Sequence, residues 1–133
     1  MESKKRASHS GVFRLVLSPN RRAGSRARQA IRQRFSEMLP GVTLGDVFSV
    51  VTELVNNSVQ HGPGKPITVT LAMNEKSIRG EVADQGNPTY SIPEIKEATA
   101  TGGRGLAVVD KLTARWGVHK GSTHVWFEMA LGR

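Results

Sequence analysis

The stretch from Glu53 to His61, ELVNNSVQH, constrains this chain more than any other. Small and apolar residues recur at helical spacing through it and predict the buried stripe of an amphipathic helix beginning near Asp46: Val47, Val50, Val51, Leu54, Val55 and Ser58. Glu53, Asn57 and Gln60 lie three and four residues apart, so they share a second stripe beside the first. A carboxylate and a carboxamide one turn apart can hold a metal ion and a water. The same residues also suit an ordinary solvated helix face.

The size and composition of the chain exclude several classes of protein. Its 133 residues suit one domain with a single core. It contains no cysteine, which excludes disulfides and thiol chemistry and is compatible with a reducing cytoplasm. No apolar run approaches the length of a membrane span, and no apolar segment follows the basic N-terminus as in a signal peptide. We therefore expect a cytoplasmic protein without a membrane partner.

Positive charge is concentrated in the N-terminal third of the sequence. Residues 1–34 contain ten Lys and Arg but a single acid, and residues 1–10 are predicted to be a disordered basic tail because they have almost nothing to bury. A helix expected from about Arg22 to Leu39 places a basic face opposite its apolar one, formed by Arg21, Arg22, Arg26, Arg28 and Arg32. Such a face is either simply solvated or a docking surface for an acidic protein or for phosphates.

The order of the expected elements predicts the fold class. Strands are clustered rather than alternating with helices, at 12–17, 67–73, 78–84, 115–120 and 123–131, and a third helix is expected over 106–112. This order favours an α+β fold, a two-layer α/β sandwich in which helices cover one face of a mixed, mostly antiparallel sheet.

Two further segments are candidates for a binding site. Asp84 ends a predicted strand on the same face as Ile78 and Val82, so its carboxylate should be partly dehydrated and need a donor, unless it is only a turn acid. The run Gly102-Gly103-Arg104-Gly105 opens the third helix, where backbone N–H groups and the helix dipole favour an anion. Arg104 adds a guanidinium suited to phosphate. Many glycine-rich helix starts are only tight turns.

Taken together and in this order, Glu53-x-x-x-Asn57, Asp84-x-Gly86 and Gly103-x-Gly105 resemble the motifs of the GHKL (Bergerat-fold) superfamily of ATPases and kinases. DNA gyrase, histidine kinases and MutL share that ATP-binding fold. The segment from Glu53 to Gly62, the run 102–106, Trp116-Gly117 and Val125-Trp126-Phe127 are most similar to the single-domain anti-sigma-factor serine kinases and their actinobacterial relatives. The resemblance covers about residues 11–131.

The resemblance implies a role for each matching residue. Asn57 would coordinate the Mg²⁺ that bridges the ATP phosphates, and Glu53 would be the general base. Asp84 would accept a hydrogen bond from the adenine amino group. Gly86 would let the backbone pass close to the base, and Gly103, Arg104 and Gly105 would contact the phosphates. Residues 87–101 would form a lid. The sequence has Pro88 where a second glycine is common, which puts lid mobility and turnover in question.

The resemblance implies an ATP-dependent protein serine/threonine kinase over residues 11–133 that regulates transcription. Its partners would be an anti-sigma antagonist, which it phosphorylates, and a sigma factor, which it sequesters; relatives often pair as homodimers. The alternative is a nucleotide-dependent protein-binding module without significant kinase turnover. Nucleic-acid binding through the arginine-rich helix is disfavoured because its basic face contains no aromatic residue for stacking.

Overall fold

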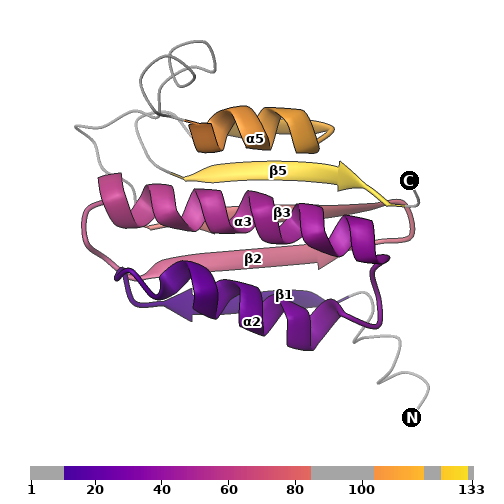
Figure 1. Ribbon diagram of the computed structural model, residues 1–133, viewed down its shortest axis with the longest axis horizontal. Coiled ribbons are helices and arrows are strands. Elements are labelled where there is room, and N and C mark those ends of the chain that lie inside the picture. The colour runs from indigo at the N-terminus through magenta and orange to yellow at the C-terminus, as the bar shows by residue number, and fades with distance from the viewer. Residues whose placement is uncertain (1–10, 85–103, 119–123, 132–133) are drawn as a thin grey trace.

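A computed structural model describes residues 11–84, 104–118 and 124–131, and it confirms the predicted α+β sandwich of two layers (Figure 1). The elements follow the predicted order: β1 (Val12–Leu17), α2 (Ala23–Phe35), α3 (Gly41–His61), β2 (Ile67–Met73), β3 (Ser77–Ala83), α5 (Arg104–Leu112), β4 (Arg115–Val118) and β5 (Val125–Ala130). The predicted tail at 1–10 and lid at 87–101 lie outside the described residues.

The five strands form one sheet in the order β1-β2-β3-β5-β4. All four pairings between the described strands are antiparallel, so the parallel part of the predicted mixed sheet is not found there. A tight turn joins β2 to β3, in which the Asn74 side chain accepts hydrogen bonds from the backbone N–H groups of Lys76 and Ser77 at 2.7 and 2.8 Å. Short connections of this kind favour antiparallel neighbours.

Alternation along the strands directs one face of the sheet toward the helices. Val69, Val82 and Val125 lie in register across three strands and are almost completely buried. The next row places Leu71 and Phe127 on either side of Gly80. A Cβ on Gly80 would overlap the Phe127 ring, so the glycine provides the space that this ring occupies.

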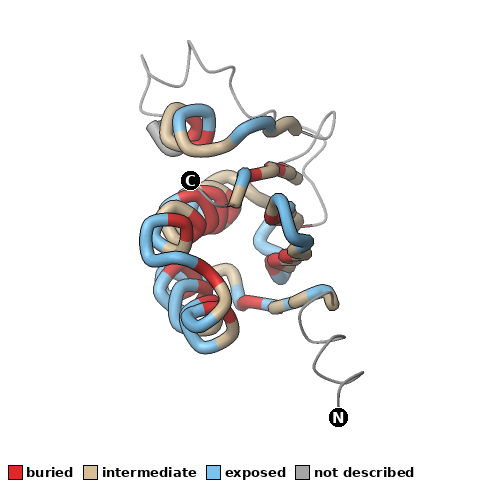
Figure 2. Tube along the Cα trace, turned by 90° about the vertical axis from the view of Figure 1, so that its right-hand side faces the viewer, coloured by how far each residue is buried: buried red, intermediate tan, exposed pale blue. Residues whose placement is uncertain are grey.

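The helices cover that apolar face (Figure 2), and the apolar side chains of helices and sheet form one buried core. Helix α3 lies between α2 and α5 (Figure 1). Its sheet-facing residues are buried as the periodicity predicts: Val47, Val50, Val51, Leu54, Val55 and Ser58. Burial of a Val or Leu side chain contributes roughly 1.5–3 kcal/mol, so this stripe fixes the orientation of α3 on the sheet.

Two predicted helix boundaries are wrong by several residues. Helix α3 begins at Gly41 rather than near Asp46, because Pro40 has φ −56° and ψ 151° and its carbonyl accepts the Leu44 N–H at 2.8 Å. A proline fits the N-cap position because its missing N–H would have no partner within the helix. Helix α2 ends at Phe35 rather than at Leu39. The chain leaves the helix through a turn in which the Met38 and Leu39 N–H groups both donate to the Phe35 carbonyl, at 2.9 and 3.0 Å. Pro40 additionally disfavours the helical conformation at Leu39.

None of the helices within the described ranges is both long enough and apolar enough to cross a membrane.

Candidate functional site

The polar stripe of α3 is only partly accessible to solvent. Glu53 and Asn57 are half-buried, one turn apart, while Gln60 is exposed. Their neighbours Leu54 and Ser58 point into the core, which places Glu53 and Asn57 at the border between the buried and solvated faces of the helix. A carboxylate and a carboxamide at such a border are held in place by the packed helix and remain reachable from outside.

Asp84 is buried, as its strand parity predicts. It directly follows β3, and its residue exposure is 1%, which is rare for a carboxylate. A Cβ built on Gly62, at the end of α3, would overlap the Asp84 carboxylate and the carbonyl oxygen of Ser58. The end of β3 is therefore in contact with the end of α3.

The start of α5 lies at this same end of the molecule. In Figure 1 the final turn of α3, the end of β3 and the first turn of α5 are all at the left, and α5 packs on α3. Helix α5 begins at Arg104, two residues before the predicted span of 106–112, so that Gly105 lies in its first turn. The side chain of Arg104 and the residues Gly86 and Gly103 lie outside what the structure describes, so their predicted contacts stay predictions.

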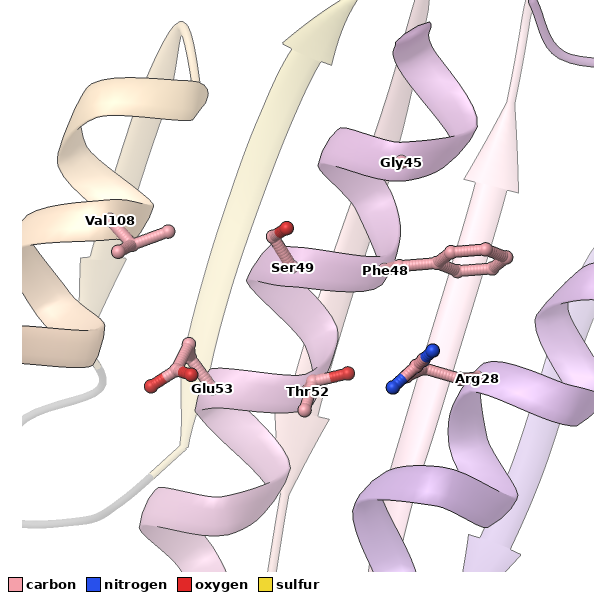
Figure 3. Close-up of a pocket in the computed structure, with 7 residues that line it drawn as sticks. All are labelled: Arg28, Gly45, Phe48, Ser49, Thr52, Glu53 and Val108. Carbon is pink, nitrogen blue, oxygen red and sulfur yellow. The ribbon is translucent and has the colours of Figure 1, made fainter. Parts of the chain in front are cut away.

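A pocket of about 410 Å³ opens on the solvent side of α3, between α2 and α5 (Figure 3). Its lining comes from all three helices: Arg28, Gly45, Phe48, Ser49, Thr52, Glu53 and Val108. Figure 3 shows Glu53 directed toward the α5 side and Arg28 reaching α3 from the opposite side, with Thr52 between them. The pocket therefore has an anionic side and a cationic side.

The structure brings some of the predicted site residues together and separates others. Asp84 is joined to the end of α3 through Gly62, while Glu53 lines the pocket farther along that helix. Neither Asn57 nor Asp84 lines the pocket. In the part of the chain that the structure describes, no group of three or more His, Asp or Glu side chains could hold a metal ion. A Mg²⁺ held by one or two protein oxygens and by phosphates needs no such group.

Two residues of this region were not singled out from the sequence. Gly62 was part of a quoted motif, but its close approach to Asp84 depends on which helix end meets which strand end, and only the fold supplies that. Arg28 was counted with the basic face of α2. Arg28 lies two residues after Arg26, so the two side chains point to different sides of the helix. That spacing is the sequence signal that could have distinguished Arg28 from the rest of the basic face.

Comparisons with known proteins identify the class to which this fold and site belong. Residues 18–129 match the histidine kinase-like ATPase domain family, and the chain therefore belongs to that family. A search of curated proteins gave no match.

One similar solved structure contains the RsbU and RsbW domains of Rv1364c from Mycobacterium tuberculosis. The TM-score is 0.67 at 19% sequence identity, and the alignment covers 91% of this chain and 31% of that chain. This chain thus corresponds to less than a third of that protein, and the likeness supports the fold. The family and the fold together confirm the GHKL resemblance of the sequence motifs.

Proposed function

We propose that residues 11–133 form one domain that binds ATP with Mg²⁺ and transfers the γ-phosphoryl group to a serine or threonine of a protein partner. One observation carries the proposal. In a member of the histidine kinase-like ATPase family, a buried strand-end carboxylate, Asp84, lies against the end of the helix that bears Glu53 and Asn57. The family binds ATP, and these three residues are the ones that its motifs single out.

The chemistry of the described side chains fits an adenine nucleotide. The buried Asp84 carboxylate is a hydrogen-bond acceptor, which is what an adenine amino group requires of its partner. Asn57 offers a carboxamide oxygen, a ligand type that Mg²⁺ accepts alongside phosphate oxygens and water. Bound Mg²⁺ would neutralise charge on the phosphates. Gly86, Gly103, Arg104 and Gly105 complete the proposed site at the base and the phosphates.

Glu53 is assigned the catalytic role that the family resemblance implies, and its position in the lining of the pocket is compatible with that role. The acceptor hydroxyl oxygen forms a bond to the γ-phosphorus of ATP, and the bond from that phosphorus to the bridging oxygen breaks. ADP leaves with the electron pair, and the hydroxyl proton passes to the Glu53 carboxylate. Positioning and charge neutralisation supply most of the acceleration in reactions of this type.

The resemblance to anti-sigma-factor serine kinases supports the class of partner. We propose that the substrate is a small anti-sigma antagonist protein, that the domain sequesters a sigma factor as a regulator of transcription, and that it acts in the cytoplasm, where ATP is available. Nucleotide binding would select one arrangement of the segments around the phosphates and thereby alter the surface offered to partners.

Transfer from γ-labelled ATP to candidate antagonist proteins tests the proposal, with Glu53→Gln as the decisive variant. The native chain should label its substrate, and the variant should bind ATP with unchanged affinity but transfer at least about a hundredfold more slowly, as expected for loss of a general base. Measurable ATP binding without transfer by the native chain would instead identify a nucleotide-dependent binding module.

A further inference from the structure

The cationic side of the pocket belongs to a helix without any acidic residue. Helix α2 reads AGSRARQAIRQRF, and Arg28 and Arg32 lie one turn apart on it. The Arg32 guanidinium lies over the ring of Phe48, 5.2 Å from its centroid, which anchors that charge against α3. Arg28 lines the pocket beside Phe48 and forms no ion pair within the described residues. Its charge is available to a bound anion.

The opposite side of the pocket contains the proposed general base. Glu53 belongs both to the polar stripe of α3 and to the lining of the pocket. From Glu53 the polar stripe continues toward Asn57, and the pocket extends in the opposite direction, toward Gly45. An acceptor hydroxyl must reach Glu53 from a direction that the nucleotide leaves free. The pocket supplies such a direction.

The walls between these two charges offer both apolar and polar contacts. Phe48 and Val108 provide apolar surface, and Ser49 provides an exposed hydroxyl. A volume of about 410 Å³ accommodates a few side chains, which suits a short loop rather than a whole domain face.

We propose that this pocket recognises the acceptor segment of the protein substrate, and that the segment is acidic. Its serine or threonine hydroxyl faces Glu53, and an aspartate or glutamate nearby in the segment pairs with Arg28. A bidentate guanidinium–carboxylate pair fixes orientation as well as adding affinity, so Arg28 is a specificity-determining residue. The inference rests on the proposed kinase function, and it adds the chemical character of the substrate and the residue that selects it.

The observations favour an acidic protein segment over a nucleic acid. The Glu53 carboxylate lines the same pocket and repels a phosphodiester chain, whereas a segment that carries one hydroxyl and one carboxylate complements both sides. Phe48, the aromatic residue of the lining, is already covered by the Arg32 guanidinium, which leaves its ring less available for base stacking.

Fluorescence anisotropy with a labelled acidic peptide tests this assignment. The probe contains one serine, several aspartates and a leucine, and the matched peptide has asparagine in place of each aspartate. Arg28→Glu is compared with Arg26→Glu, which makes the same change in charge on the same helix at a position that does not line the pocket. A fluorescent ATP analogue is titrated into every variant.

We expect the native chain to bind the acidic peptide at least about tenfold more tightly than its asparagine counterpart, and Arg28→Glu to abolish that difference. Arg26→Glu should retain it, and salt should weaken it. Equal peptide affinity in Arg28→Glu and Arg26→Glu overturns the inference, as does tighter binding of a single-stranded oligonucleotide than of the peptide. Failure of the native chain to bind the ATP analogue counts against the proposed function instead, so the two failures are distinguishable.

Discussion

The carboxylate of Asp84 packs directly against Gly62 and thereby joins the end of β3 to the end of α3. Gly62 has φ −76° and ψ −179°, a conformation open to any residue, so its backbone does not require glycine. The limited space around Gly62 does require glycine, because a Cβ there would overlap both the Asp84 carboxylate and the Ser58 carbonyl oxygen. The position of the buried carboxylate therefore depends on a missing side chain twenty-two residues earlier in the chain.

Gly62→Ala should displace Asp84 and weaken both the fold and the nucleotide site. Overpacking of this kind costs about 1–3 kcal/mol of unfolding free energy, and ATP affinity should fall in parallel if Asp84 holds the base. Chemical denaturation and calorimetry measure the two effects. Gly41→Ala is the control, since a Cβ at that position in α3 meets nothing within 4 Å. Equal stability of the two variants would contradict the packing argument.

Gly80→Ala should destabilise the sheet without touching the site. The new Cβ would overlap the Phe127 ring and approach Leu71 Cδ2 to 2.8 Å, and we expect a loss of about 1–3 kcal/mol in unfolding free energy. Adding Phe127→Leu should recover part of that loss, because the two changes share one space and are not additive. Thermal denaturation of the single and double variants checks this. Strictly additive losses would show that the ring does not occupy the space above Gly80.

Asn57→Ala should remove the Mg²⁺-dependent part of nucleotide affinity. With one Mg²⁺ ligand lost, ATP affinity in Mg²⁺ should fall toward the value measured in EDTA, by about tenfold, as for other changes close to a metal. Asn56→Ala is the matched control. Asn56 has the same side chain at the preceding position of the helix, but it is exposed and lies beside Gly24. An unchanged response to Mg²⁺ in Asn57→Ala would rule out the assigned metal ligand.

Much of the fold follows from local patterns in the sequence. The periodicity of α3 predicts each of its buried residues, and alternation along β5 predicts that Val125, Phe127 and Met129 face inward. These predictions succeed because one apolar face must be buried whatever the details of the topology. The start of α3 is predicted less well. Asp46 suggests an N-terminus, but the chain is already helical from Gly41, and Pro40 is the N-cap residue.

The candidate site was predicted only where a local rule applied. Strand parity alone indicates that Asp84 faces inward, and helical spacing alone places Glu53 and Asn57 on one stripe. The packing of Gly62 on Asp84 and the approach of Arg28 to the Glu53 pocket join elements that are distant in the sequence. No local pattern encodes such contacts, so they emerge only from the folded structure.

Calorimetric titration of ATP into the native chain and into Asp84→Asn tests the central claim most directly. The substitution preserves shape but replaces one of the two acceptor oxygens with an NH₂ donor and removes the negative charge, and a mismatched buried polar group costs about 1–3 kcal/mol. Thermal unfolding should first show that Asp84→Asn is folded. The native chain should then bind ATP, with affinity at least about tenfold lower in Asp84→Asn. Equal ATP affinity in the two folded proteins would contradict the assignment of Asp84 to the adenine.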